Sequence, residues 1–296
     1  MIVHVGYFKT GTTYLQNNVF PFMEGVHYHD YEESKKIFKP VHTGTTFEFN
    51  AEQVAKSFDQ REDSLYSYER LVGKMGVGTY NYQIAERLKK LGFKKIIFTI
   101  RRQDKIVESL YRQYIQEGGV LKPSSFVKDR RYFRTSHLDY YQLIVHYADL
   151  FGKENILILP QEELRSNPAI ALEKLRIFCG AKAIHLEKQK KFGSRTNTSI
   201  SYLSAHIMRI VNHFTKNEYK PSNLISGKIT TWKFRFFFQS IIDRYLTPKS
   251  LKKKPLVKQS FKEKLLEEHV EENVHLQEEF DVNLEKYDYF EPQSSK

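Results

Sequence analysis

The sequence contains little cysteine and no long apolar run, and each shortage excludes a class of protein. Its single cysteine, Cys179, excludes an intrachain disulfide, so the chain does not need an oxidising compartment. No segment approaches the roughly 20 consecutive apolar residues that a membrane-spanning helix needs. Residues 1–6 (MIVHVG) have neither the basic region nor the apolar region of a signal peptide. We therefore expect a soluble, cytoplasmic protein in which Cys179, within an apolar run, is buried and inert.

Positive charge is in excess, with 47 Lys and Arg against 35 Asp and Glu, and the formal net charge is +12 at pH 7. Apolar residues make up 40% of the 296-residue chain, which is enough to bury a core and excludes a disordered protein. An excess of positive charge suits an anionic partner such as a nucleotide, a nucleic acid, an acidic glycan or a membrane surface. Charge alone does not choose among these partners.

Short apolar runs alternate with segments of helical periodicity. Strands are predicted at residues 2–5, 64–68, 94–100 and 155–159, and helices at 12–20, 80–91, 104–116, 138–151, 168–179, 200–214, 228–246 and 259–287. The polar residues 22–63 predict a loop or a helical excursion. This alternation is typical of an α/β fold in which helices flank a mostly parallel sheet. We interpret the chain as one domain, with an α/β core at 1–182 and a mainly helical extension at 183–296.

A glycine-containing loop follows the first predicted strand. Residues 2–13 (IVHVGYFKTGTT) place Gly6 and Gly11 at the glycine spacing of a nucleoside triphosphate P-loop. Such a loop directs backbone N–H groups at an anion, which makes the expected core P-loop NTPase-like. The triphosphate motif continues with a lysine and then serine or threonine, whereas here Thr12 and Thr13 follow, and the nearby cation is Lys9, inside the loop. The earlier lysine reaches different oxygens from those contacted in a metal-dependent NTPase.

The segment Lys9-Thr10-Gly11-Thr12-Thr13 resembles the 5′-phosphosulfate loop of sulfotransferases that use 3′-phosphoadenosine 5′-phosphosulfate (PAPS), in particular bacterial-type enzymes similar to carbohydrate sulfotransferases. The resemblance implies that PAPS is the donor and that Lys9 contacts the region bridging phosphate and sulfate. It also implies that loop amides and hydroxyls hold the 5′-phosphate. For this segment taken alone, a tight strand-to-helix turn without a ligand is the alternative.

A second motif follows a later strand, in residues 98–114 (FTIRRQDKIVESLYRQY). Arg101 ends the predicted strand, and Ser109 lies eight residues later on the next helix. The pair resembles the segment of the same family in which an arginine and a serine grip the 3′-phosphate, and a planar, permanently charged guanidinium suits that role. The family often has Asn-Pro after the arginine, where this chain has Arg102 and Gln103, so Arg102 is a second candidate. Ordinary surface arginines at a strand end are the alternative.

Both motifs are predicted at the carboxyl ends of parallel strands, which meet at one edge of a sheet and form ligand sites there. A third segment, the basic loop at 188–199, corresponds in its place along the chain to a part of sulfotransferases that closes over the nucleotide. Arg195 is the candidate contact in this loop, and a solvated loop is the alternative.

The base that takes the proton of an acceptor hydroxyl is predicted at the end of the second strand. Such a base must lie within hydrogen-bond reach of the hydroxyl, while Lys9 would stabilise the charge on the leaving oxygen. Family members use a histidine or a glutamate, and Glu69 stands where the resemblance places that base. His42, in a polar segment, is the second candidate, and a surface position without catalytic function is the alternative for both. No residue spacing calls for a metal ion.

A glycan or another hydroxyl-bearing molecule is the expected acceptor, and the sequence names neither the acceptor nor an oligomeric state. The aromatic and basic segment 232–238 (WKFRFFF), followed by three lysines at 252–254, suggests peripheral contact with an anionic membrane at its inner face. A core-facing helix with basic flanks explains the same residues.

Three other functions stay open. A P-loop kinase-like phosphotransferase would need a lysine at position 12 and a metal-binding aspartate after a strand, and neither is evident. A basic nucleic-acid-binding protein is suggested by the net charge. The strand-end positions of Lys9 and Arg101 favour a discrete nucleotide site, and no nucleic acid is expected. A non-catalytic protein that keeps a nucleotide site is the third.

Overall fold

The computed structural model describes residues 1–45, 47–188, 200–214, 241–243, 245, 247–252 and 254–291. These residues form two compact units, and each unit is assembled from separate stretches of chain. The first unit comprises Met1–Gln103, Arg134–Phe192 and Leu266–Lys296, and the second comprises Asp104–Phe133 and Gly193–Leu265. The loop with Lys9 and the strand end with Arg101 therefore belong to the first unit. The helix expected at 228–246, with its aromatic segment, lies largely outside the described residues.

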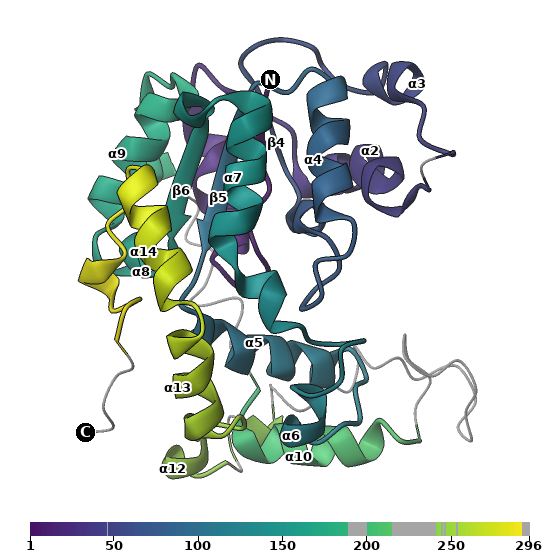
Figure 1. Cartoon of the computed structure of the whole chain (residues 1–296), viewed down its shortest axis with the longest axis vertical. Coiled ribbons are helices and arrows are strands. Elements are labelled where there is room, and N and C mark those ends of the chain that lie inside the picture. The colour runs from purple at the N-terminus through teal and green to yellow at the C-terminus, as the bar shows by residue number, and fades with distance from the viewer. Residues whose placement is uncertain are drawn as a thin grey trace. The chain divides into compact units, whose positions relative to one another are not determined.

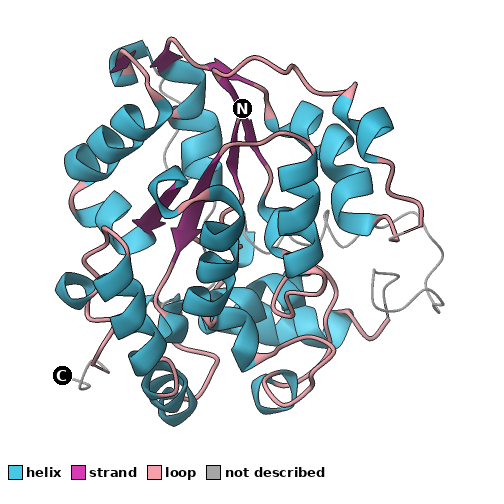
Figure 2. Cartoon of the chain, turned by 45° about the horizontal axis from the view of Figure 1, so that its top comes forward, coloured by secondary structure: helices cyan, strands magenta, loops and turns pink. Residues whose placement is uncertain are grey.

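A five-stranded sheet runs through the first unit (Figures 1 and 2). Its order is β3-β4-β1-β5-β6, and every neighbouring pair is parallel. The strands are β1 Ile2–His4, β3 His27–Tyr28, β4 Ser64–Ser67, β5 Lys95–Ile100 and β6 Ile156–Pro160. A separate antiparallel pair joins β2, Met23–Glu24, to β7, Ala183–Ile184. The α/β fold with a mostly parallel sheet is confirmed, and β1 lies between β4 and β5.

Helices surround this sheet, and a helical C-terminal region is present as expected. The first unit contains α1 Thr12–Asn18, α2 Tyr31–Thr43, α3 Ala51–Ala55, α4 Asn81–Lys90, α7 Tyr140–Phe151, α8 Gln161–Ser166, α9 Pro168–Cys179 and α14 Val270–Glu279. The second unit contains α6 Pro123–Phe126, α10 Tyr202–Val211, α12 Lys249–Lys252, and most of α5 Gln103–Gln116 and α13 Gln259–Glu267. Among the helices of the described residues, none combines the length and the apolar character needed to cross a bilayer.

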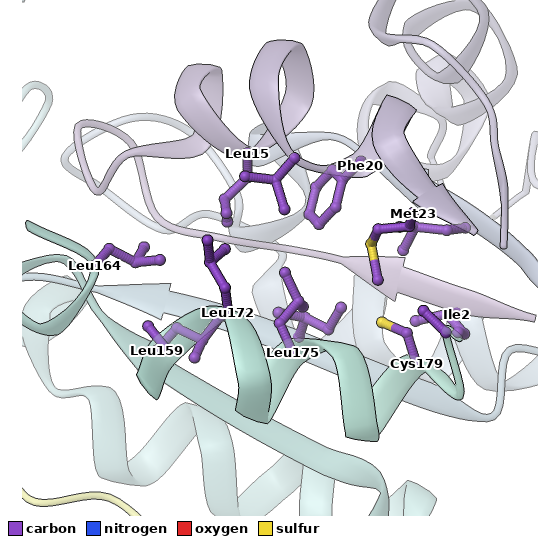
Figure 3. Close-up of a cluster of buried hydrophobic side chains, with 14 residues drawn as sticks. Ile2, Leu15, Phe20, Met23, Leu159, Leu164, Leu172, Leu175 and Cys179 are labelled. Carbon is purple, nitrogen blue, oxygen red and sulfur yellow. The ribbon is translucent and has the colours of Figure 1, made fainter. Parts of the chain in front are cut away.

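One face of the sheet packs against α1 and α9. Side chains alternate along a strand, so Ile2, Leu65 and Ile97 share a face and join one buried cluster with residues of these two helices. In Figure 3 the labelled side chains of the N-terminal helical segment point toward those of α9. Cys179 of α9 belongs to this cluster, and burial raises the pKa of its thiol to about 12. The expectation of a buried cysteine is therefore confirmed, and the raised pKa agrees with an inert thiol.

The other face packs against α2, α4 and α7. Tyr66 of β4, one residue after the cluster residue of that strand, meets Phe38 of α2 with ring centroids 6.0 Å apart. Phe98 of β5 meets Tyr147 of α7 edge-on at 5.0 Å. Because both faces of the sheet are covered, the strands read in the sequence as nearly continuous apolar runs. The carboxyl ends of the strands lie at one edge of the sheet, and the polar side chains of the candidate site lie at that edge.

The segment 22–63 contains more structure than a loop. Its α2 begins after Asp30, whose carboxylate accepts the Glu33 amide at 2.9 Å as an N-cap, so a helical excursion is confirmed. The edge strand β3 was not predicted, because two residues carry no local periodicity. Its existence depends on pairing with β4, in which His27 lies opposite Ser64.

The prediction of a single helix over 259–287 is wrong. The structure ends α13 at Glu267 and begins α14 at Val270. Between them, His269 leaves helical geometry, and its ring nitrogen Nε2 lies 3.1 Å from the Thr135 carbonyl oxygen. The apolar spacing continues through the break, so local periodicity alone could not reveal it.

Candidate functional site

The loop after β1 turns through two left-handed residues. Its first part runs alongside β5, where the Tyr7 amide donates to the Thr99 carbonyl at 3.0 Å. The chain then reverses, with φ of 66° at Lys9 and 97° at Gly11, directly before α1. This backbone suits glycine but costs a lysine about 1–2 kcal/mol. Residues held in such conformations cluster at functional sites, so the backbone and the sequence motif both single out Lys9.

A buried polar network lies beneath this loop. His4, Ser67 and Thr99 stand on one face of three adjacent strands, β1, β4 and β5, and all three are fully buried. His4 Nδ1 lies 2.7 Å from Ser67 Oγ, and His4 Nε2 lies 3.1 Å from Thr99 Oγ1. Thr99 Oγ1 is in turn 2.7 Å from Thr10 Oγ1, inside the loop. The histidine thus bridges the two strands that flank its own.

The direction of each hydrogen bond in this network can be deduced. Thr10 spends its single hydroxyl proton on the Tyr7 carbonyl, so Thr99 must donate to Thr10. Thr99 then has no proton left for His4, and Nε2–H of His4 must donate to Thr99. Burial lowers the pKa of His4 to about 3, so the ring is neutral and its Nδ1 accepts from Ser67. The network therefore selects the Nε2–H tautomer of His4.

The network continues from Ser67 to the predicted base. The Gln16 side chain, on α1, donates through Nε2 to Ser67 Oγ at 3.0 Å and reaches Glu69 Oε2 at 3.5 Å. One amide nitrogen carries two protons, so it can serve both acceptors. Glu69, half-buried at the start of a 3₁₀ turn after β4, is thereby linked to Thr10 of the loop that contains Lys9.

The first glycine of the motif is explained by this network. A Cβ added at Gly6 would lie 1.9 Å from Thr99 Oγ1 and 2.5 Å from His4 Nε2. Both distances are far below van der Waals contact, so any side chain at position 6 would separate the two hydrogen-bonded groups. Gly6 therefore keeps the network intact, in addition to any role near a ligand.

We expect protonation of His4 to destabilise the fold at low pH. Its pKa falls from 6.5 in a model peptide to about 3 when buried, so between these values the unfolded chain binds a proton that the native protein refuses. The free energy of unfolding should then fall as the pH drops from 6.5 toward 3, by about 1.4 kcal/mol per pH unit from this group. Urea unfolding of wild type and His4→Gln between pH 4.5 and 7 measures it.

The difference between wild type and His4→Gln should grow smaller as the pH falls. The control is His185→Gln, which replaces a partly exposed histidine. The ring nitrogens of His185 lie 2.9 Å from Glu24 Oε2 and 3.0 Å from Glu187 Oε1. Parallel stability curves for wild type and His4→Gln would show that His4 is not held neutral.

Arg101 lies where the second motif places it, at the end of β5. Its guanidinium Nη1 donates to the Lys9 carbonyl at 3.1 Å, and its own carbonyl accepts from the Tyr140 hydroxyl. Burial lowers the pKa of Arg101, and nearby Glu162 opposes that shift. The guanidinium therefore stays charged beside the loop. The structure thus brings the loop of the first motif and the arginine of the second into direct contact.

Arg102, the second arginine candidate, points elsewhere. It is 2% exposed, and its guanidinium pairs with Asp288 of the C-terminal segment at 3.3 Å. The adjacent Gln103 donates to Asn273 of α14 at 2.9 Å. These contacts hold the C-terminal segment against the end of β5. From the sequence we expected that segment only as part of a mainly helical extension.

The remaining candidate residues differ in their surroundings. Thr12 is buried at the first position of α1 and Thr13 is half-buried beside it, while Thr10 uses its hydroxyl inside the protein. Ser109 belongs to the second unit, on α5, and its hydroxyl donates to the Lys105 carbonyl one turn earlier at 3.4 Å. Arg195 lies outside the described residues.

Both candidate bases are neighbours of Tyr68, His42 in space and Glu69 in the chain. His42, in the last turn of α2, contacts the Tyr68 ring at 5.2 Å, and its Nδ1 is 3.0 Å from the Phe38 carbonyl oxygen. Burial lowers the pKa of His42, and the charge of Arg70 adds to that effect. Glu69 follows Tyr68 directly in the chain. Of the two, Glu69 is the one joined to the polar network.

Sequence reasoning missed the four residues that build this network, His4, Gln16, Ser67 and Thr99. A signal was present, because three of them are polar residues near the carboxyl ends of otherwise apolar strands. A polar group in such a position is expected to be buried and hydrogen-bonded. What the pattern lacked was the identity of each partner.

Comparison of the sequence with protein-family models and with curated proteins gives no match. Among solved structures, the chain is similar to a crystal structure of a sulfotransferase from Alicyclobacillus acidocaldarius, with 13% sequence identity and a TM-score of 0.48. The similarity covers 71% of this chain and 92% of that chain. Likeness at this level concerns the architecture, so the function of this chain must be argued from its own residues.

Proposed function

We propose that this protein transfers a sulfuryl group from PAPS to an acceptor hydroxyl. The observation that carries the proposal is the meeting of three strand ends at one edge of the sheet. They bring together the loop with Lys9, the arginine Arg101 that donates to that loop, and the carboxylate Glu69. This edge is where parallel α/β sheets bind ligands.

The donor is suggested by the position of the loop lysine. Position 12, where a nucleoside triphosphate P-loop has its lysine, holds a largely buried threonine, and the cation is Lys9, in the middle of the turn. A lysine there suits a phosphosulfate, whose charge develops on the oxygen that bridges phosphorus and sulfur. Arg101 offers a fixed, charged donor for a second phosphate.

The reaction balances with the groups present. The acceptor oxygen forms a bond to sulfur while the bond between sulfur and the bridging oxygen breaks, in line. The acceptor proton goes to the Glu69 carboxylate. The electron pair stays on the bridging oxygen of adenosine 3′,5′-bisphosphate, where Lys9 stabilises it. The scheme uses only the side chains of this chain and needs no metal ion to balance.

Calorimetric titration with adenosine 3′,5′-bisphosphate tests this proposal directly, with ADP as the comparison and no metal added. We expect binding that requires the 3′-phosphate. Arg101→Ala should weaken the bisphosphate by about tenfold or more, because a charge-assisted bond to phosphate contributes more than a neutral one. The same variant should change the affinity for 5′-AMP much less. Equal binding of ADP and the bisphosphate would instead favour a kinase-like phosphotransferase.

We also propose that the acceptor hydroxyl belongs to a glycan or glycolipid. The net charge of +12 supports an acidic acceptor or one displayed at an anionic surface. Labelled PAPS offered with acidic glycans, neutral glycans and simple phenols would identify the class. Transfer to phenols alone would exclude a glycan acceptor.

A further inference from the structure

Two histidines and an aspartate lie together at the edge of the sheet, away from the strand ends described above. His27 begins β3, and His29 follows its last residue, where the His29 amide still donates to the Leu65 carbonyl of β4, so the two histidines share a face. Asp59 comes from the segment before β4. One ligand atom from each residue lies within 4.8 Å of the other two. His27 of this cluster pairs with Ser64, the first residue of β4, whereas Glu69 comes after the last residue of that strand.

His29 is held in one orientation by the protein around it. Its side chain is 6% exposed, and its ring stacks on Tyr66 at 4.1 Å with an interplanar angle of 5°. Its Nδ1 lies 3.0 Å from Glu33 Oε1. Its Nε2 is buried, has no hydrogen-bond partner, and faces Asp59 Oδ2 at 3.8 Å, beyond hydrogen-bond distance.

One tautomer of His29 leaves a lone pair facing a carboxylate. In the tautomer whose Nδ1–H donates to Glu33, the Nε2 of the ring presents its lone pair to Asp59. A buried nitrogen lone pair and a carboxylate oxygen 3.8 Å apart form a favourable pair of ligands for a cation between them. A carboxylate that orients a histidine through its other ring nitrogen is also the usual support of a metal-bound histidine.

Tyr66 orders both sides of the cluster. Its ring stacks on His29, and its hydroxyl accepts the Asp59 amide at 2.7 Å. The ring of His27 packs edge-on against that of His29, with the two ring centroids 4.6 Å apart. One tyrosine of the core thus fixes a buried histidine and the backbone of the aspartate that faces it.

We propose that His27, His29 and Asp59 bind a divalent transition-metal ion of the zinc type, with water completing its coordination. Zinc binds imidazole and carboxylate at about 2.0–2.2 Å, which brings tetrahedral ligand atoms to about 3.3 Å from one another. The ligands must therefore move together slightly. His27 is exposed and Asp59 is partly exposed, so both can close on the fixed His29. The ion would join the segment before β4 to the edge strand, and this inference is independent of the proposed sulfuryl transfer.

Arg61 competes for the same carboxylate. Its Nε lies 2.9 Å from Asp59 Oδ2, and its amide donates to Asp59 Oδ1 at 3.2 Å. A carboxylate has about four lone-pair positions, so it can bind an ion and keep these contacts. The positive charge nevertheless repels a cation, and Arg61→Gln should tighten metal binding by about fivefold.

Titration of the full chain with Co²⁺, followed by visible absorption, and with Zn²⁺, followed by calorimetry, tests the site. We expect one saturable equivalent in the wild type. His27→Gln and Asp59→Asn, both outside the core, should each weaken that equivalent by about tenfold or more. The matched control is His185→Gln, which removes a histidine flanked by Glu24 and Glu187 and should change nothing.

Zinc should also raise the thermal midpoint of the wild type, because only the native fold brings the three ligands together, and it should not raise that of the His27→Gln, Asp59→Asn double variant. The absence of saturable binding, or equal affinity in the wild type and both single variants, would overturn the proposal. Unchanged affinity in Arg61→Gln would count against Asp59 as a ligand and so against the three-residue site. Nucleotide binding by the same variants stays normal if only the metal site is affected.

Discussion

Replacing Lys9 with alanine should lower the rate of sulfuryl transfer by about 10³-fold while leaving the fold intact. Lys9 is half-buried in the turn between β1 and α1, and its charge is the one that the proposed reaction places against the leaving oxygen. An alanine keeps the Cβ at this left-handed position, so the strain of the loop stays the same and only the charge is removed. Release of adenosine 3′,5′-bisphosphate from PAPS in the presence of acceptor measures the rate.

Two companion variants separate charge from geometry. Lys9→Arg keeps the charge but spreads it over a planar fork, so it should recover only part of the rate. Lys36→Ala removes an exposed lysine from α2 and should leave turnover unchanged. Urea unfolding should give Lys9→Ala a stability within about 0.5 kcal/mol of wild type. Normal turnover of Lys9→Ala would remove the loop from the reaction and leave it as a strand-to-helix turn.

Glu69→Gln is expected to lower kcat by about 10²-fold or more, because an amide cannot accept the acceptor's proton. The substitution keeps the size of the side chain and a polar contact with Gln16, so the network below the loop should survive. Affinity for adenosine 3′,5′-bisphosphate should therefore stay close to that of the wild type. A fall in kcat with unchanged product affinity separates a catalytic role from a structural one.

The matched control is Glu62→Gln, and His42→Gln tests the second candidate base. Glu62 is an exposed glutamate before β4 that pairs with Lys94 at 2.6 Å, and its replacement should not affect transfer. His42, whose ring packs on Tyr68, has a lowered pKa through burial and is therefore neutral at pH 7, so it too could accept a proton. An unchanged rate in Glu69→Gln together with a large loss in His42→Gln would transfer the role of base to the histidine.

Local signals in the sequence explain most of the strands and helices of the first unit. Four apolar runs predicted β1, β4, β5 and β6, because buried parallel strands need no alternation of polar and apolar residues. The edge strand β3 escaped prediction because its two residues become a strand only by pairing with β4. The interruption at His269 escaped for a related reason, since its partner Thr135 lies far away in the chain.

The sequence by itself determined that a glycine-containing loop follows β1 and that its lysine is Lys9, not a residue at position 12. It also determined that Arg101 and Glu69 stand at the ends of predicted strands. These features are local, since a strand, a turn and a following helix each depend on neighbouring residues. The order of the strands is not local, and it alone makes those three ends neighbours.

Only the tertiary structure decided how the polar groups around the loop are used. It directed the Thr10 hydroxyl into the protein, placed the Gln16 amide within reach of Glu69, and paired Arg102 with Asp288. These hydrogen bonds and ion pairs connect residues 53 to 186 positions apart. A buried donor or acceptor must find a partner wherever the fold brings one, and that requirement selects the tautomer of His4 and links the loop to Glu69.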